Sequence, residues 1–300
     1  VREDRFVAAL DEPLDAGPVA PVASFHNPDT IEAALALKSA HPEATWIAGA
    51  TDLGVSLGRG REVATAFIAL DRIAELAQID VTDDAVRIGA GATLSRVGTR
   101  LAGMFPALDQ MLPWFAGRQV RNRSTFGGNL GTASPIGDLL PVLLALDAAV
   151  ELRSARGERT VAAQDFFLDY RRTARDADEL IVAVTIPRRP GLVSASYKVA
   201  KRQTDDISIV AAVFALELDG EGRVADARLA YGGVAATPRR ATRTEALLSG
   251  RRLDPATVDE ARASLESEFE PIDDLRAGAA YRRALAGNLF AKFVHEHVPA

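Results

Sequence analysis

The sequence contains no cysteine among its 300 residues. A disulfide framework, a thiolate nucleophile, a cysteine zinc site and a cysteine-ligated iron–sulfur cluster are therefore excluded within this chain. Histidine is also rare. Of the four, His295 and His297 lie two positions apart on a predicted helix, where their side chains point to different sides. We therefore assign no metal ligand and no catalytic histidine.

A large excess of one charge and long apolar runs are missing as well. The net charge is −6, from 35 Lys and Arg against 41 Asp and Glu, which argues against a protein that binds nucleic acid or an anionic membrane. No apolar run approaches the roughly 20 residues of a membrane span, and no signal peptide is visible, so we expect a cytoplasmic protein. The first residue is Val1 rather than Met, which leaves open a natural subunit or a fragment of a longer polypeptide.

Length predicts a protein of about two domains, because 300 residues exceed the usual size of one core. Residues 1–17, rich in Pro, Asp and Ala, are predicted to be a linker or arm. The turn-rich "RRPG" at 188–191 separates a region of mixed helices and strands, residues 18–190, from residues 191–300. In this last region three antiparallel strands precede three helices.

Two local patterns in the first region predict a helix and a loop. The run "TLSRVGTRLAGMFPALDQML" at 93–112 has helical periodicity, with Thr93 as its N-cap. Residues 121–138, "RNRSTFGGNLGTASPIGD", are predicted to form a glycine-rich loop ahead of a buried helix.

Nucleotide-binding fingerprints are incomplete. The stretch "GAGATL" at 89–94 follows a predicted strand and precedes a helix, as a dinucleotide fingerprint does. Its third glycine is replaced by Leu94, which removes the close helix–strand packing that the glycine permits. We interpret it as a structural turn. No GxxxxGK[ST] motif occurs, so a P-loop NTPase is excluded.

The segment "WIAGATDLGVSL" at 46–57 is the first candidate binding loop. A predicted strand runs into Gly49 and is followed by the small residues Ala50, Thr51 and Asp52. Backbone N–H groups exposed in such a turn can face an anion. An ordinary strand–turn is the alternative.

The glycine-rich loop at 121–138 is the second candidate. Gly127 and Gly128 would let the backbone approach a ligand, and Asp138, acceptor-only when ionised, suits a sugar or polyol hydroxyl. Trp114 and Phe115, just upstream, would suit a planar ring, although core packing explains one of them equally well. Side-chain hydrogen bonds to a ligand could come from Thr125, Asn129, Thr132 and Ser134.

These two segments, together with "FFLDYRRTARDADELIVAVTIP" and "YKVAKRQTDDISIVAAVFALELDG", resemble in order the FAD-binding part of xanthine dehydrogenase. More broadly, they resemble the flavoprotein subunits of molybdenum hydroxylases. The resemblance covers about residues 20–298. It implies an α+β fold in which residues 18–190 form an FAD-binding domain of the vanillyl-alcohol-oxidase/MurB (PCMH) type. A smaller α+β domain would follow, like the C-terminal domain of carbon monoxide dehydrogenase flavoproteins, with a three-stranded antiparallel sheet and helices.

By motif, the resemblance implies that residues 46–53 wrap the pyrophosphate and adenosine side of FAD and that residues 125–129 form a second pyrophosphate loop. Phe115 would stack on the isoalloxazine ring, and Asp138 would bind a cofactor hydroxyl. No side chain is implied as an acid, base or nucleophile. Phe126 stands where a smaller aliphatic residue is expected. The implied cofactor-binding residues are Trp46, Ile47, Ala48, Gly49, Ala50, Thr51, Asp52, Leu53, Phe115, Thr125, Gly127, Gly128, Asn129, Ser134, Asp138, Ile181 and Lys198.

The resemblance implies an oxidoreductase component of purine catabolism, which takes electrons from [2Fe–2S] clusters and reduces NAD⁺ at the flavin. The clusters and the molybdopterin would lie in a partner domain or chain of a larger hetero-oligomer. One alternative is a flavoprotein subunit of a carbon monoxide dehydrogenase- or aromatic-hydroxylase-like complex, with a quinone, O₂ or another acceptor. A second is a flavin-free docking subunit. The oxidised substrate is not indicated.

Overall fold

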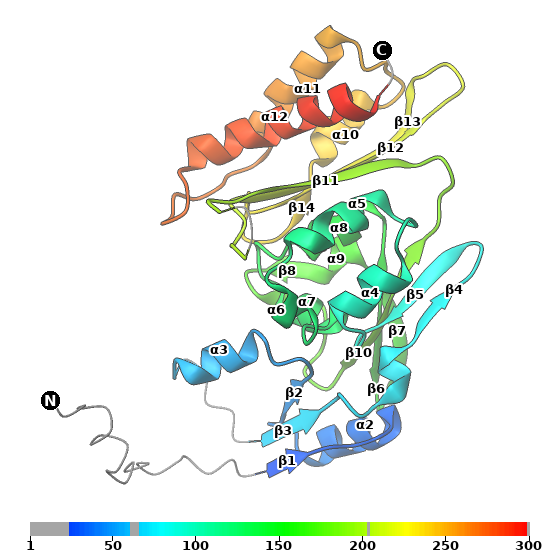
Figure 1. Cartoon of the computed structure of the whole chain (residues 1–300), viewed down its shortest axis with the longest axis vertical. Helices are drawn as coiled ribbons and strands as arrows, with labels where there is room; N and C mark the ends of the chain where they lie inside the picture. Colours follow the sequence, from blue (N-terminus) through cyan, green and yellow to red (C-terminus); the bar gives the residue numbers. More distant parts are fainter. Residues whose placement is uncertain (1–23, 61–65, 203–204, 299–300) are drawn as a thin grey trace, which may run out of the picture.

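The computed structural model describes residues 24–60, 66–202 and 205–298, so the predicted arm at residues 1–17 lies outside it. Figure 1 shows an elongated molecule built in successive layers, with a small parallel sheet at one end and three helices at the other. In the part that the structure describes, no helix is long and apolar enough to cross a membrane.

The parallel-sheet unit has three strands in the order β1-β3-β2. Helix α2 covers it and begins after Thr30, whose hydroxyl accepts a hydrogen bond from the Ala33 N–H. Its apolar face, with Ile31 and Leu35, is buried on the sheet. The elements are β1 (Ser24–His26), α2 (Ile31–Ala40), β2 (Thr45–Ile47), α3 (Leu53–Gly58) and β3 (Ala66–Ala69).

A five-stranded antiparallel sheet, in the order β4-β5-β10-β6-β7, forms the centre of the first domain. In its central strand β10 every residue except Thr185 is apolar, and most of the strand is buried. Leu180 and Val182 pack with the parallel-sheet unit, whereas Val184 and Ile186 belong to the main core. The elements are η1 (Ala74–Ala77), β4 (Ile79–Val81), β5 (Ala85–Gly89), β6 (Ala149–Ser154), β7 (Gly157–Ala162) and β10 (Leu180–Pro187).

The helical layer corrects two predictions. The single helix expected over 93–112 is two helices, because Gly103 adopts a left-handed φ of 82° and Pro106 starts a new helix; the predicted cap at Thr93 is present. The expected loop at 121–138 contains helix α7, which Thr125 caps. The elements are α4 (Leu94–Arg100), α5 (Pro106–Met111), η2 (Leu112–Trp114), α6 (Arg118–Arg121), α7 (Phe126–Thr132), α8 (Leu139–Ala145), α9 (Ala163–Phe166), β8 (Phe167–Asp169) and β9 (Arg172–Thr173).

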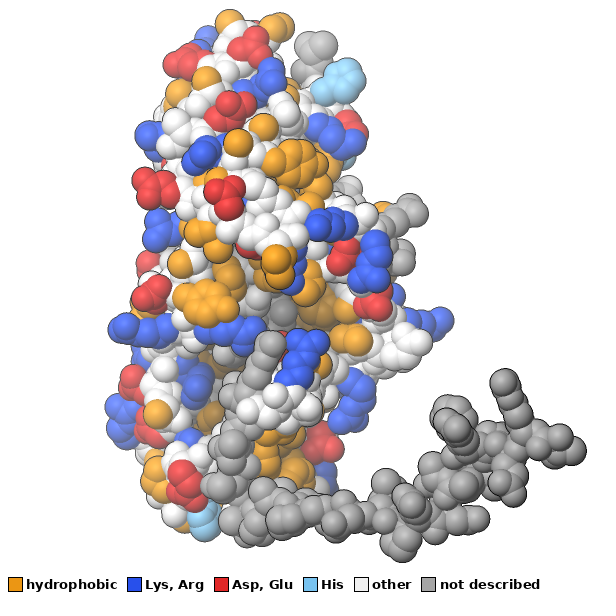
Figure 2. All heavy atoms as spheres, turned by 90° about the vertical axis from the view of Figure 1, so that its left-hand side faces the viewer, with side chains coloured by type: hydrophobic (Ala, Val, Ile, Leu, Met, Phe, Trp, Pro, Cys, Tyr) orange, Lys and Arg blue, Asp and Glu red, His pale blue; other side chains and the backbone are white. Residues whose placement is uncertain are grey.

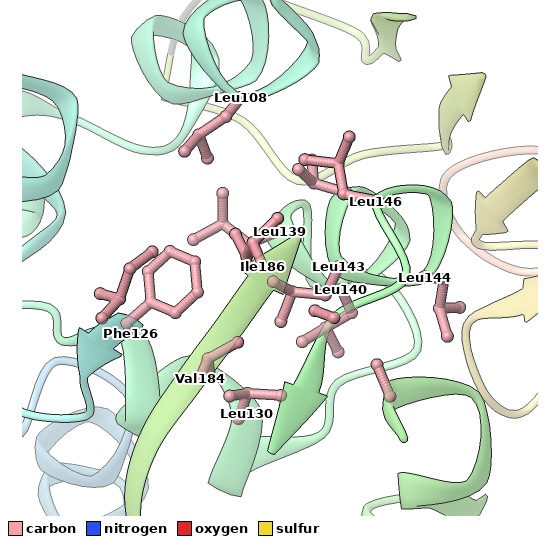
Figure 3. Close-up of a cluster of buried hydrophobic side chains, with 14 of the residues drawn as sticks. Leu108, Phe126, Leu130, Leu139, Leu140, Leu143, Leu144, Leu146, Val184 and Ile186 are labelled. Atoms are coloured by element: carbon pink, nitrogen blue, oxygen red, sulfur yellow. The ribbon is translucent and has the colours of Figure 1, made fainter. Parts of the chain in front are cut away.

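Phe126, which the family resemblance left unexplained, is a core residue. Its side chain is 1% exposed and lies with Leu108, Leu139 and Ile186 in the main cluster (Figure 3). The ring therefore anchors the first turn of α7 to the core.

The second domain contains the three predicted strands, and a short fourth strand, β14, extends the antiparallel sheet to the order β11-β12-β13-β14. Strand β12 is buried on both faces. Its small residues Ala211, Val213 and Ala215 join the main core of the first domain, and Phe214 packs against Phe290 and other aromatic rings on the opposite face. The elements are β11 (Val193–Val199), β12 (Val210–Leu218), β13 (Val224–Gly232), β14 (Arg239–Arg240), α10 (Thr242–Leu248), α11 (Pro255–Glu268) and α12 (Ala279–His297).

Candidate cofactor site

The two candidate binding loops lie against each other. The Thr51 and Ser124 hydroxyl oxygens are 2.8 Å apart, which joins the turn after β2 to the segment before α7. At Gly49 the backbones approach so closely that a Cβ atom would lie 1.9 Å from the Arg123 carbonyl oxygen. Only glycine fits there, because real Cβ atoms do not approach a carbonyl oxygen to within 3 Å.

The first loop contains a run of five successive backbone N–H groups, which we call the nest (residues 49–53). Among the described residues, none accepts a hydrogen bond from any of these five N–H groups. Ala50 is in the left-handed conformation, with φ of 59°, whereas Asp52 is in the right-handed helical region. A change between left-handed and right-handed backbone turns successive N–H groups toward one point. The nest therefore has the construction of an anion site.

In the second loop, the N–H groups of both glycines at 127 and 128 are already hydrogen-bonded within the protein. The Gly127 N–H donates to Ala90 O at 2.8 Å, and the Gly128 N–H donates to Thr125 Oγ1 at 3.0 Å. A Cβ atom at Gly127 would lie 2.5 Å from the Ala90 Cβ. The protein itself thus requires a glycine at 127. One acceptor is left over: the Asn129 Oδ1 atom is buried and has no partner among the described residues.

The "GAGATL" stretch packs against this loop and, as interpreted from the sequence, makes a turn between β5 and α4. The Gly91 N–H donates to Leu76 O at 2.7 Å, and the Leu94 N–H donates to Ser124 O at 3.0 Å. A Cβ atom at Gly89 would lie 2.3 Å from Leu76 O. These glycines serve the packing of the turn.

Left-handed backbone also borders the site at two further alanines. Ala116 has φ of 43° and Ala133 has φ of 45°. Each such non-glycine residue costs about 1–2 kcal/mol, and strain of this kind concentrates at functional sites. Figure 2, viewed from the side on which α3 and α6 lie in Figure 1, shows several Lys and Arg side chains across its middle, with Asp and Glu side chains among them.

The aromatic edge of the site is held by Arg121. Its Nη1 atom donates to Phe115 O at 2.8 Å and to Ala116 O at 2.6 Å. Phe115 is half-buried against the main core, whereas Trp114 is 39% exposed. Trp114 borders a cavity of about 310 Å³, whose other lining residues are Lys198, Val199, Ala200, Lys201 and Arg202.

Asp138 and Lys198 form a buried ion pair between the two domains. Lys198 Nζ lies 2.6 Å from Asp138 Oδ2 and donates to Trp114 O at 3.0 Å. The Ser208 hydroxyl donates to the other carboxylate oxygen, Oδ1. Burial raises the pKa of the Asp138 carboxyl, and the Lys198 ammonium opposes that rise. Both oxygens of the predicted hydroxyl-binding carboxylate are therefore bonded to side chains of the second domain.

The remaining predicted residues lie on both sides of the nest. The Trp46 indole N–H donates to Glu179 O at 3.1 Å. Ile181 is buried beneath α7, where a Cβ atom at Gly131 would lie 3.7 Å from Ile181 Cδ1. Ser134 Oγ accepts a hydrogen bond from the Ile136 N–H at 3.4 Å. Ile47 and Ala48 lead into the nest, and Asp52 Oδ2 lies 3.4 Å from Arg171 Nη1.

Sequence reasoning missed three residues that organise the site: Ser124, Arg121 and Ser208. Ser124 and Arg121 belong to the quoted segment at 121–138, and their polar side chains beside its glycines were an available signal. Ser208 is 70 positions from Asp138, and no spacing rule joins them.

The residues present fit FAD. The free N–H groups of the nest suit a pyrophosphate, and the orphaned Asn129 Oδ1 atom suits a hydroxyl or amine donor. This polar site lies next to an aromatic edge at Phe115 and Trp114.

Comparison with known families finds a match for each of the two domains. The family described as the FAD binding domain in molybdopterin dehydrogenase matches residues 21–189. The chain belongs to the family of molybdopterin dehydrogenase FAD-binding domains. The family described as the CO dehydrogenase flavoprotein C-terminal domain matches residues 195–297.

Curated relatives are much longer than this chain. The xanthine dehydrogenase of Emericella nidulans is 34% identical over 287 residues, which are 91% of this chain and 21% of that protein. The xanthine dehydrogenase/oxidase of Gallus gallus is 34% identical over 282 residues, 89% of this chain and 21% of that protein. The chain spans about a fifth of the length of these relatives.

Similar solved structures match the chain almost end to end. Carbon monoxide dehydrogenase from Hydrogenophaga pseudoflava has a TM-score of 0.86 and 28% identity, covering 90% of this chain and 94% of that one. Quinoline 2-oxidoreductase from Pseudomonas putida 86 also has a TM-score of 0.86 and 28% identity, covering 93% and 97%. The predicted α+β flavoprotein fold is confirmed, and the chain is an FAD-binding module of the molybdenum hydroxylase family.

Proposed function

We propose that this chain is the electron-transfer module of a xanthine dehydrogenase-like molybdenum hydroxylase, which binds FAD, receives electrons from [2Fe–2S] clusters and reduces NAD⁺. The observation that carries the proposal is the nest at 49–53, whose N–H groups have no acceptor among the described residues and which lies at the contact between the two candidate loops. FAD, when bound, supplies the exchange between one-electron carriers and a hydride acceptor.

The chain's own residues would bind and orient the cofactor. The N–H groups of the nest would donate to the pyrophosphate oxygens, and Asn129 and Ser134 would hydrogen-bond the same ligand. Phe115, held through its carbonyl by Arg121, would lie against the flavin ring. Lys198 and Asp138 would present a nearly neutral pair rather than a net charge, because each charge offsets the other at 2.6 Å.

The cavity beside Trp114 supports NAD⁺ as the acceptor. An exposed indole offers a stacking surface for a planar ring, and Lys201 and Arg202 in the same lining offer cations to a pyrophosphate. A second candidate function is favoured by the solved structures, which include carbon monoxide dehydrogenase and quinoline 2-oxidoreductase. In that case the same module would pass its electrons to a quinone or another acceptor.

Either function requires partners outside this chain, since it has no cysteine for an iron–sulfur cluster. We propose an iron–sulfur domain or subunit and a molybdenum-cofactor subunit, assembled in a hetero-oligomer. A cytoplasmic location and a role in purine catabolism stay predictions.

Two measurements test the proposal. The purified chain should show flavin absorbance and release FAD on denaturation; colourless protein that takes up no FAD on reconstitution would favour the flavin-free docking subunit instead. The complete complex, supplied with xanthine and NAD⁺, should form NADH. Flavin content without NADH formation would favour the second candidate function.

A further inference from the structure

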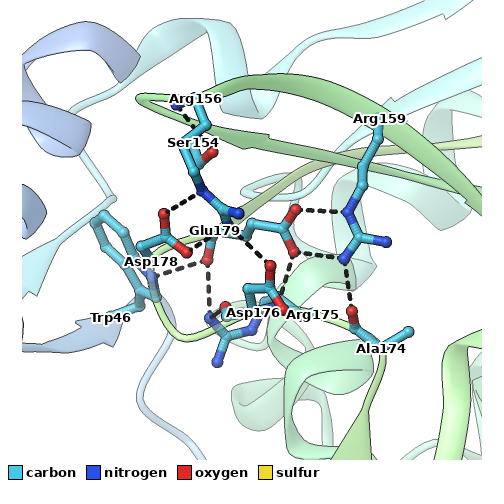
Figure 4. A network of polar contacts seen from close by, with 9 residues as sticks. All are labelled: Trp46, Ser154, Arg156, Arg159, Ala174, Arg175, Asp176, Asp178 and Glu179. Carbon is cyan, nitrogen blue, oxygen red and sulfur yellow. Dashed lines mark hydrogen bonds and ion pairs between the residues drawn. The ribbon is translucent and has the colours of Figure 1, made fainter.

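A polar network joins the parallel-sheet unit to the five-stranded sheet next to the nest. Trp46, at β2, donates its indole N–H to Glu179 O at 3.1 Å, across 133 positions of sequence (Figure 4). Trp46 stands three residues before Gly49, and Glu179 stands two residues before Ile181. This hydrogen bond therefore ties the strand that enters the nest to the strand on the other side of the candidate site.

Glu179 is the fixed point of this network. Its side chain is only 5% exposed, and its two carboxylate oxygens accept from Arg159 Nε at 2.6 Å and from Arg159 Nη2 at 2.8 Å. The Asp176 N–H donates to the same carboxylate at 2.7 Å. Arg159 lowers the pKa of Glu179, so the carboxylate is ionised at neutral pH. Paired guanidinium–carboxylate bonds fix direction as well as distance.

The Arg159–Glu179 pair also orders the loop that carries it. Arg159 Nη2 donates to Ala174 O at 2.6 Å, and Arg175 Nη1 donates to Glu179 O at 2.8 Å. The carbonyl of Glu179 thus accepts from both Trp46 and Arg175. Farther out, Arg156 pairs with Asp176 and Asp178, but its side chain is 63% exposed, and solvent screens such pairs.

Apolar packing already holds the two units together. Leu180 and Val182 of β10 share a core cluster with Ile31 and Ile68 of the parallel-sheet unit. Loss of the polar network should therefore leave the units attached, and change only their relative position.

We propose that the Arg159–Glu179 pair is a positioning element for the cofactor site, which sets the place of Trp46, and through it of the nest, relative to Ile181. The inference rests on the proposed function in one respect: the ligand that reports the position of the nest is FAD. Neither Arg159 nor Glu179 needs to touch that ligand.

The test measures FAD affinity in three variants of the complete chain. Arg159→Met removes the guanidinium and leaves an unbranched apolar side chain in place of the arginine stem. Arg159→Lys keeps the charge and loses the paired geometry. Arg156→Met is the matched control, because it removes an arginine of the same network that pairs only at the surface. Apoprotein is titrated with FAD well below the unfolding temperature, and far-UV circular dichroism and thermal unfolding are recorded in parallel.

We expect FAD to bind about tenfold more weakly to Arg159→Met, the equivalent of one charge-assisted hydrogen bond. Arg159→Lys should be intermediate, and Arg156→Met should stay within about twofold of the parent chain. A role in stability alone would lower the unfolding temperature and leave the dissociation constant unchanged, and would overturn the inference. Equal losses in Arg159→Met and Arg156→Met would overturn it too.

Two further outcomes are distinguishable. If the parent chain binds no FAD, the proposed function fails. If the parent chain binds FAD and Arg159→Met does not fold, Arg159→Lys decides: parental affinity in that variant contradicts the positioning role, and a several-fold loss supports it.

Discussion

The two loops of the candidate site look alike in sequence but use their backbone N–H groups differently. Both are rich in glycine and small polar residues, and they touch through Thr51 and Ser124. In the nest, five successive N–H groups have no acceptor among the described residues. In the loop that begins α7, the N–H groups of Gly127 and Gly128 are already bonded to Ala90 and Thr125.

A glycine in such a loop can be required by packing within the protein or by a bound ligand. Gly49 and Gly127 are both required by contacts within the protein, with Arg123 O and with Ala90 respectively. Neither glycine by itself indicates a ligand. What distinguishes the nest is its unused donors, and we infer that it supplies most of the anion affinity while α7 supplies a rigid wall.

Gly49→Ala is expected to have the largest effect. A Cβ atom 1.9 Å from the Arg123 carbonyl forces the two loops apart, and because the obstacle is backbone, relief is costly. We expect a loss of about 3 kcal/mol or more in stability and loss of FAD from the purified protein, measured by thermal unfolding and by flavin absorbance. The matched control is Gly54→Ala in α3, where no atom of the described residues lies within 4 Å of the added Cβ atom. Equal behaviour of the two variants would show that the loops are not in contact.

Gly127→Ala should have the second largest effect, mainly on stability. The added Cβ atom would lie 2.5 Å from the Ala90 Cβ, and overpacking of this kind costs about 1–3 kcal/mol. In the same helix, the Cβ atom added by Gly131→Ala would lie 3.7 Å from Ile181 Cδ1, an ordinary contact distance. This variant should leave the stability unchanged or raise it. Thermal unfolding compares them, and the FAD dissociation constant of folded Gly127→Ala should change less than that of Gly49→Ala. A larger change at Gly127 would reverse the assignment of the two loops.

Local rules predicted the Thr93 cap and the three strands of the second domain, but not which residues contact each other in the site. Thr93 caps its helix as predicted, because capping depends on a neighbour three positions away. Helix α7 was expected to be a loop because its glycines disfavour helix; the buried Phe126 ring and the Thr125 cap outweigh that preference.

The long-range bonds of the site had no local signal. Trp46 meets Glu179 across 133 positions, and Asp138 meets Lys198 across 60. Such contacts follow from how whole sheets pack, which the periodicity of one segment does not specify. The family resemblance predicted Lys198 as a site residue. It did not predict that Lys198 pairs with Asp138, which only the structure shows.

Thr51→Val tests the contact between the loops with a smaller change. Valine keeps the shape of threonine and removes the hydroxyl that lies 2.8 Å from Ser124 Oγ. Because Ser124 is buried, its hydroxyl loses its partner, and we expect a loss of about 1 kcal/mol in stability with a few-fold weaker FAD binding. The control is Thr99→Val, whose hydroxyl bonds Ser95 O on an exposed helix face and should cost less than about 0.5 kcal/mol. Indistinguishable melting temperatures would mean that the contact contributes nothing.

Ala50→Gly should have the smallest effect on stability and the most specific effect on binding. Ala50 has φ of 59°, so glycine relieves about 1 kcal/mol of strain, and the extra freedom of the unfolded chain offsets about 0.4–1 kcal/mol of that gain. Stability should hardly change. FAD affinity should nevertheless fall a few-fold, because a glycine there leaves the nest less preorganised. Ala133→Gly, at the left-handed end of α7 with φ of 45°, makes the same exchange in the loop whose donors are already bonded. When both apoproteins are titrated with FAD, only Ala50→Gly should show weaker binding than the parent chain. An equal loss in both variants would mean that the two loops share the anion, and that free N–H groups do not distinguish them.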